Sequence, residues 1–372
     1  MNRHETQGRS GVTGALMVLS GGTAWQVVSP TVVEASHMLA GVAAASPAEV
    51  WVVGHVGQHP LVARWDGTRW TIPPGPLPVA SHIGAGFRGI AVAGRDSRAK
   101  PARPAGRPEA DVSVQAIAVG GGYDRLAAAE VPLIHHWNGS VWDAWEGWPE
   151  DPRAARGFVL TDVAMVGEEA WAVGHGLLRG GPPGPVALHR HGGAWHAAET
   201  PSVAKGRLLA VSATSDGDVW AVGAADRTGL VMHYDGRSWT RVPIPTTRFP
   251  LTGVVALARD DAWAVGRDRV LRWNGRKWRK VDAPVTAANT VTALAPDDVW
   301  VAGGRGELAH FDGRTWSRTP SPQPLGDTAV WLASASLPAP EAGGAWLVGS
   351  HQVPQAGTVG TASSITAQSG DS

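Results

Sequence analysis

The chain has 372 residues, a formal net charge of zero and no cysteine. Charge neutrality argues against a large nucleic-acid-binding surface, and the lack of cysteine excludes disulfides, thiolate metal sites and a cysteine nucleophile. No stretch reaches the roughly 20 apolar residues of a membrane helix, so we expect no membrane contact.

The first predicted element is a strand, turn and strand over residues 16–28. Its sequence LMVLSGGTAWQVV aligns without gaps on LVMHYDGRSWTRV, which starts at residue 230, so Trp25 matches Trp239. The apolar run at residues 15–19 is too short for the core of a secretory signal. We therefore expect a structural role for this segment and a cytoplasmic protein.

A repeat occupies the rest of the chain. Each copy has an apolar strand, an acidic turn, a V-W-A-V-G strand, a variable connection, an apolar strand and a hairpin ending in tryptophan. The V-W-A-V-G strands end at Gly54, Gly120, Gly174, Gly223, Gly266, Gly303 and Gly349, and Ile117 replaces the tryptophan in the second copy. Repeats of this length indicate a stacked architecture.

The second hairpin of each copy is found only six times after residue 37. Its tryptophans are Trp70, Trp142, Trp195, Trp239, Trp278 and Trp316. The missing copy is the N-terminal segment with Trp25. We therefore predict an all-β fold, a seven-bladed β-propeller of four-stranded blades over residues 16–353, whose last blade is completed by residues 16–28.

Local signals support the strands. The V-W-A-V-G element is rich in β-branched and aromatic residues, and Asp-Gly or Asn-Gly pairs such as Asp235-Gly236 suit tight hairpin turns. We expect Asp218, Asp261 and Asp298 to bond backbone amides of the turns they follow. The repeated tryptophans are expected to fill the wedges between blades.

Three segments lie outside the repeat. Residues 1–15 and 354–372 are predicted tails, and residues 94–112 are a Pro-, Ala- and Arg-rich insertion predicted to be disordered. Only four of the 32 basic residues are lysine, and this bias suggests a GC-rich, bacterial genome.

The repeat resembles kelch-type propellers and the galactose-oxidase central domain, whose strands end in a double glycine. Here I-A-V-G-G at residues 117–121 and V-A-G-G at residues 301–304 carry it. The resemblance implies the fold but no activity, because the cysteine-linked tyrosine of the galactose-oxidase copper site has no counterpart in a chain without cysteine.

A ligand site is expected on the face formed by the second-to-third and fourth-to-first connections, since variable loops on a rigid ring usually bind. Its predicted residues are His55, His59, Tyr123, Arg125, His175, Asp226, Arg227, Arg267, Asp268, Arg305, Glu307 and His351. The arginines suit carboxylate or phosphate groups. His55, His59 and His351 come from adjacent blades, but their spacing matches no metal signature, so we predict neither metal nor cofactor.

Four histidines, His136, His189, His233 and His310, recur in the third strand and are assigned a structural role. We predict a monomeric, non-catalytic binding scaffold for a protein, peptide or glycan, with no nucleic-acid partner. Two alternatives stay open. One is an enzyme with His, Asp and Arg groups at the mouth of the central channel, and the other is a lectin.

Overall fold

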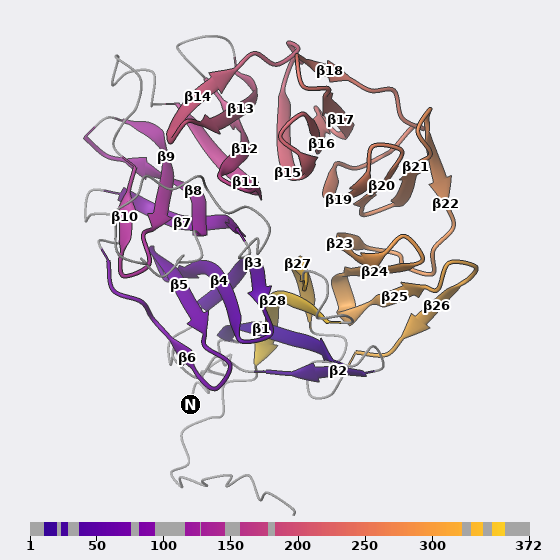
Figure 1. Ribbon diagram of the computed structural model, residues 1–372, viewed down its shortest axis with the longest axis horizontal. Helices are drawn as coiled ribbons and strands as arrows, with labels where there is room; N and C mark the ends of the chain where they lie inside the picture. The colour runs from indigo at the N-terminus through magenta and orange to yellow at the C-terminus, as the bar shows by residue number, and fades with distance from the viewer. Residues whose placement is uncertain are drawn as a thin grey trace, which may run out of the picture.

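The computed structural model describes residues 11–20, 24–28, 37–75, 82–93, 116–126, 128–145, 157–177, 183–321, 329–337 and 344–353. These residues form seven four-stranded antiparallel sheets arranged in a ring (Figure 1). The predicted seven-bladed propeller is therefore confirmed. The predicted insertion at 94–112 and the tail at 354–372 lie outside the described residues.

Six blades use four consecutive strands each, and we number them in chain order. Blade 1 consists of β3 (His37–Ser46), β4 (Glu49–Val56), β5 (His59–Trp65) and β6 (Trp70–Thr71). Blade 2 consists of β7 (His82–Val92), β8 (Ala116–Asp124), β9 (Ala129–Trp137) and β10 (Trp142–Ala144). Blade 3 consists of β11 (Phe158–Val166), β12 (Glu169–Gly176), β13 (Gly184–His191) and β14 (Ala194–Ala198). Blade 4 consists of β15 (Gly206–Ser215), β16 (Asp218–Ala225), β17 (Thr228–Tyr234) and β18 (Trp239–Arg241). Blade 5 consists of β19 (Leu251–Ala258), β20 (Asp261–Gly266), β21 (Arg269–Trp273) and β22 (Trp278–Val281). Blade 6 consists of β23 (Ala288–Ala295), β24 (Asp298–Gly303), β25 (Leu308–Phe311) and β26 (Trp316–Thr319).

Blade 7 joins the two ends of the chain. Its sheet order is β27 (Val330–Ser336), β28 (Ala345–Val353), β1 (Gly11–Ser20) and β2 (Ala24–Val27), so the N-terminal segment supplies its two outer strands, as predicted. β1 begins at Gly11 rather than at the predicted residue 16. The reason is that β28 continues to Val353, and Gly11 pairs with Val353 at the end of the ladder.

The first strand of every blade lies innermost and carries a β-bulge at the same place (Figure 1). The ladder register between first and second strands shifts around Ala40, Arg88, Thr161, Leu209, Thr252, Asn289 and Leu332. A bulge adds one residue and increases local twist. These strands line a central cavity of about 380 Å³.

Side chains at the bulges tie neighbouring blades together. The Thr161 hydroxyl donates to the Leu208 carbonyl in the next blade (2.9 Å), and Thr252 donates in the same way to the Asn289 carbonyl (2.8 Å). The Asn289 amide continues the series to the Trp331 carbonyl (3.1 Å). Strands at the channel are therefore joined across blades as well as within them.

Tryptophans fill the wedges between blades, as predicted. At six of the seven junctions, the second-strand tryptophan of one blade meets the fourth-strand tryptophan of the next, edge to face and 5.2–6.2 Å between ring centres. Trp25 belongs to this series, because it packs against Trp300 at 5.4 Å and 83°. The N-terminal segment therefore makes the same junction as any internal blade.

The junction between blades 2 and 3 is different. Ile117 takes the tryptophan position and packs in one cluster with Trp195. The indole N–H of Trp195 donates to Nε2 of His136 at 3.1 Å. A hydrogen bond between blades thus accompanies the smaller apolar side chain here.

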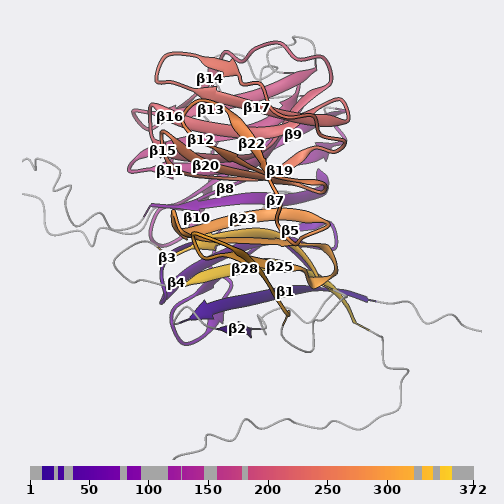
Figure 2. The same cartoon turned by 90° about the vertical axis from the view of Figure 1, so that its right-hand side faces the viewer.

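Each blade presents one end of its strands to either face of the ring, which Figure 2 shows edge-on. The second-to-third and fourth-to-first connections share one face, which we call the variable-loop face. The Asp-Gly and Asn-Gly hairpins share the other. Among the described residues no helix is long and apolar enough to cross a membrane.

Candidate functional site

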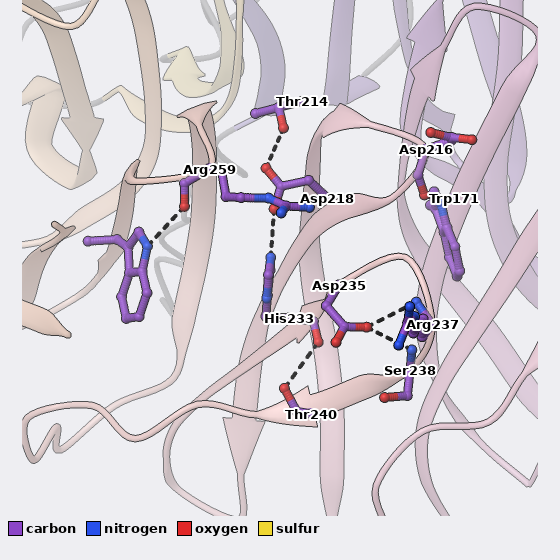
Figure 3. A network of polar contacts seen from close by, with 11 residues as sticks. Trp171, Thr214, Asp216, Asp218, His233, Asp235, Arg237, Ser238, Thr240 and Arg259 are labelled. Atoms are coloured by element: carbon purple, nitrogen blue, oxygen red, sulfur yellow. Dashed lines mark hydrogen bonds and ion pairs between the residues drawn. The ribbon is translucent and has the colours of Figure 1, made fainter. Parts of the chain in front are cut away.

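The third-strand histidines belong to the scaffold, as predicted. His189, His233 and His310 stack on the second-strand tryptophan of their own blade with ring centres 4.1–4.3 Å apart. An acid at the start of the second strand completes each group. His233 lies 2.6 Å from Asp218, whose other oxygen accepts the Thr214 hydroxyl (Figure 3).

Two further blades replace histidine by arginine in the same arrangement. Arg272 makes two hydrogen bonds of 2.9 Å to Asp261 and lies over the Trp263 ring at 4.8 Å. Arg64 pairs likewise with Glu49 and lies over Trp51. Five blades therefore share an acid–base–tryptophan group. The acidic and basic side chains of these groups pair with each other inside the blade, which gives them a structural role.

The expected partner of the second-strand acids was wrong. Asp218, Asp261 and Asp298 bond the third-strand base opposite them, because the first residue of one strand and the last turn of the next lie side by side in the ladder. In the third-to-fourth hairpins, the turn amides are held by the Asp or Asn of the hairpin itself. Asp235 Oδ1, for example, accepts from the amides of Arg237 and Ser238 (Figure 3).

The predicted ligand residues do lie on the variable-loop face, one or two from each blade. Five of the twelve lie near the ends of strands, and the other seven lie in the connections. His55 and His59 flank a two-residue turn in blade 1, and His55 Nδ1 contacts the Gly57 carbonyl at 3.2 Å. His351 sits in β28 opposite Thr13, but its side chain is outside the described part of the structure.

The charged pairs of blades 4 and 5 are partly used internally. Asp226 lies 3.7 Å from Lys205 instead of pairing with Arg227, and Asp268 lies 3.6 Å from Arg269. The Arg267 guanidinium lies over the Phe249 ring at 5.0 Å.

In blade 6, Glu307 has a structural role. It accepts hydrogen bonds from the amides of Thr286 and Ala287 and from the Thr286 hydroxyl. Burial raises the pKa of this carboxyl, but these hydrogen bonds outweigh it, so the pKa lies below its ordinary value. Arg305 remains exposed, in a left-handed conformation with φ of 57°.

In blades 2 and 3 the structure adds residues that the sequence did not single out. The pKa of His175 is lowered by burial and by Arg88 and Arg207, while Glu130 acts in the opposite direction. Arg88 is the bulge residue of β7, and Arg207 is the second residue of β15. His175 thus lies within Coulombic range of arginines from blades 2 and 4.

Neither described cavity is lined by a predicted ligand residue. The channel is lined by first strands, and a groove of about 400 Å³ on blade 4 is lined by residues 228–231 and 241–247. Within the described ranges, no group of three His, Asp or Glu side chains is placed to hold a metal ion. The convergence that the enzyme hypothesis requires is therefore not found among the described side chains.

Exposed apolar side chains gather on the variable-loop face. All seven large apolar side chains that are exposed in the described residues lie in, or at a strand end beside, the connections that form this face: Ile72, Ile83, Tyr123, Leu126, Leu177, Phe249 and Val330. Ile72 opens the fourth-to-first connection of blade 1, directly after β6. Such clustering on an otherwise polar surface is typical of interaction sites.

No family model and no curated protein matches the sequence, so the kelch-type resemblance remains a prediction. Among solved structures, the chain is similar to YCF48 bound to D1 peptide, with a TM-score of 0.53 and 15% identity over 85% of this chain and 94% of that chain. It is similar to YCF48 from Cyanidioschyzon merolae, with a TM-score of 0.51 and 17% identity over 86% of this chain and 97% of that chain. It is also similar to the WD40 beta propeller domain of Doa1, with a TM-score of 0.53 and 8% identity over 90% of this chain and 96% of that chain. These identities establish the fold alone.

Proposed function

We propose that this propeller is a binding scaffold that presents its variable-loop face to a protein or peptide. The observation that carries the proposal is that all seven large apolar side chains exposed in the described residues lie at the connections of that face. Water contact with such side chains is unfavourable by about 25 cal/mol per Å², so covering them with a partner is the use that fits their placement. The solved structure named YCF48 bound to D1 peptide shows that a propeller of this fold holds a peptide.

A peptide is favoured over a glycan because of the tryptophans. Sugar-binding propellers would need exposed aromatic faces, but no tryptophan is exposed among the described residues. Tyr123, 43% exposed, is the one large aromatic besides Phe249 that is open to solvent there. The aromatic content of the chain therefore serves the junctions between blades.

Selection from a random peptide display library tests the proposal. Peptides selected on the wild type should bind a Leu126→Ser, Leu177→Ser variant at least about tenfold more weakly, because both side chains are exposed on the variable-loop face. The matched control is Arg276→Ser, Arg314→Ser, which changes two exposed residues in hairpin turns of the opposite face. Equal loss in both variants, or no selected peptide at all, would refute the proposal.

We also propose that the protein acts as a monomer in the cytoplasm. The outer edge of each blade is a strand of only two to five residues, a length that limits edge-to-edge association, and a chain without cysteine gains nothing from an oxidising compartment. Light scattering should give the mass of one chain, and cell fractionation should recover the protein with cytoplasmic markers. A dimer mass or recovery with exported proteins would contradict these two points.

A further inference from the structure

We infer that the variable-loop face over blades 2 to 4 binds an acidic peptide segment, with its carboxylates at Arg88 and Arg207 and its apolar side chains on an adjoining apolar edge. We define the apolar edge as Ile83, Tyr123, Leu126 and Leu177. This inference rests on the proposed function, and it adds the chemistry of the partner and the place where the partner binds.

Arg88, the bulge residue of β7, lines the central channel, and Arg207 is the second residue of β15, at the variable-loop end of blade 4. Arg88 and Arg207 are both exposed, and both depress the pKa of His175, which lies between them in blade 3. Loss of hydration among the inner strands lowers the pKa of Arg88, and Glu130 opposes this shift. Both guanidinium groups therefore add positive charge around His175, between the central channel and the variable-loop face.

Neither Arg88 nor Arg207 has a close internal ion pair among the described residues, although Glu130 lies near enough to Arg88 to raise its pKa. In the described parts of the chain, no carboxylate lies within 4.0 Å of Arg88, Arg125 or Arg207, whereas the arginines of the scaffold, such as Arg272, have one. An exposed guanidinium without a carboxylate is well suited to a carboxylate from a partner, which it holds with two parallel hydrogen bonds. The surface thus offers charge complementarity to an acidic segment.

The apolar edge is continuous between blades 2 and 3. Ile83 and Tyr123 are cross-strand partners at the ends of β7 and β8. Leu177 donates its amide to the Gly157 carbonyl (2.6 Å), and the Gly157 amide donates to the Glu130 carbonyl in blade 2 (2.7 Å). This backbone relay joins Leu177 to the strand that pairs with Tyr123.

Both features together select the class of partner. Positive charge alone would suit a nucleic-acid phosphate backbone as well as a carboxylate. Leu126, which is 90% exposed, and the three other apolar side chains have no use against a phosphate backbone. A peptide in which Asp or Glu alternates with Leu or Phe satisfies both surfaces at once.

The test uses fluorescence anisotropy with labelled peptides of about ten residues, which span about 33 Å when extended. One peptide alternates Glu and Asp with Leu and Phe, and its match carries Gln and Asn in place of the acids. The wild type should bind the acidic peptide more tightly by about tenfold or more, and added salt should reduce the difference. A labelled oligothymidylate of similar length serves as the nucleic-acid probe and should bind more weakly than the acidic peptide.

The variant Arg88→Gln, Arg207→Gln should lose about tenfold or more of its affinity for the acidic peptide. Its matched control is Arg276→Gln, Arg314→Gln, which removes two exposed arginines from hairpin turns of the opposite face. If the double variant melts at a lower temperature than the wild type, affinity for the acidic peptide is measured with Arg207→Gln alone. Arg207 is an exposed residue near the start of β15, so this single substitution leaves the inner strands intact. The control should bind as the wild type does.

Three results would overturn the inference: equal affinity for the acidic and amide peptides, equal loss in the variant and its control, or tighter binding of oligothymidylate. Failure here is distinguishable from failure of the scaffold proposal. Library peptides that need Leu126 and Leu177 but carry no acids would leave the scaffold proposal standing and refute the acidic partner. A library that yields no binding peptide would refute both.

Discussion

Replacing Trp25 with alanine tests how the ring is closed. Trp25 lies in β2, is buried, and packs edge to face on Trp300 of blade 6. No covalent connection short of the whole chain joins β1 and β2 to β27 and β28 in the same sheet. The contacts of this one segment therefore hold the first and last blades together.

The expected loss is large on the scale of protein stability. Removing a buried tryptophan side chain costs about 3–5 kcal/mol, out of the roughly 5–15 kcal/mol that stabilises a typical domain. At about 2.1 cal/mol/K per residue, the unfolding entropy of 372 residues is about 0.8 kcal/mol/K, so Tm should fall by about 5 °C. Deleting residues 1–28 removes Leu16, Met17 and Leu19 as well, all buried. At about 1.5–3 kcal/mol each, their loss together with Trp25 is comparable to the entire stability.

Hydrogen exchange measured by mass spectrometry separates closure from simple destabilisation. Trp25→Ala should accelerate exchange selectively in β1 and in the β28 amides that pair with it. The matched control is Trp239→Ala, the same position in blade 4, where all four strands are consecutive. The control should lower Tm equally without selective exchange in β1. If both variants give the same exchange pattern, the reasoning about non-covalent closure is wrong.

Three further predictions concern buried polar groups. Burial raises the pKa of Asp162 to about 7, so the native protein holds a proton that the unfolded chain releases near pH 3.9. The free energy of unfolding should therefore fall by about 4 kcal/mol as the pH rises from about 4 to 7. In denaturant titrations, the Asp162→Asn variant should lose this pH dependence of the unfolding free energy. Burial, followed by Arg190 and His135, lowers the pKa of His136 to about 4; the unfolded chain then takes up a proton first, so this group removes about 3 kcal/mol as pH falls from about 6.5 to 4, and His136→Gln should abolish this component. The buried Asp218 should couple to His233 by about 1–3 kcal/mol in a double-mutant cycle of alanine variants, and additive losses would show that the pair is not an energetic unit.

The sequence predicted the scaffold because each blade repeats the same local signals. The tryptophan of the second strand and that of the hairpin recur at fixed spacing, and packing between blades needs both. Trp25 was recognisable as the missing hairpin residue for the same reason. Repetition here replaces the information that an alignment of relatives would otherwise provide.

The site was less predictable because its residues meet across blades. Arg88 and Arg207 are 119 positions apart in sequence and do not occupy equivalent positions in their blades, so no spacing pattern indicates that both act on His175. Glu307 shows that the sequence also leaves internal contacts unseen. Its place in a variable connection suggested ligand binding, but it bonds the amides of a neighbouring connection, including that of Thr286.

Blade 2 departs furthest from the repeat, and it is also the blade that carries most of the inferred peptide surface. It has Ile117 where the other blades have tryptophan, and its third-strand His136 contacts Trp195 of blade 3 rather than a tryptophan of its own second strand. It also supplies Arg88 and three of the four residues of the apolar edge. In a molecule whose other blades all keep tryptophan in the second strand, a local break in the pattern indicates selection for something other than stability. Restoring the repeat with Ile117→Trp should weaken binding of the acidic peptide, measured by anisotropy, because we expect the altered junction to position the peptide surface. Unchanged binding would show that the departure is only a packing variation. The Tm of the same variant reports whether the ring still accepts the larger side chain.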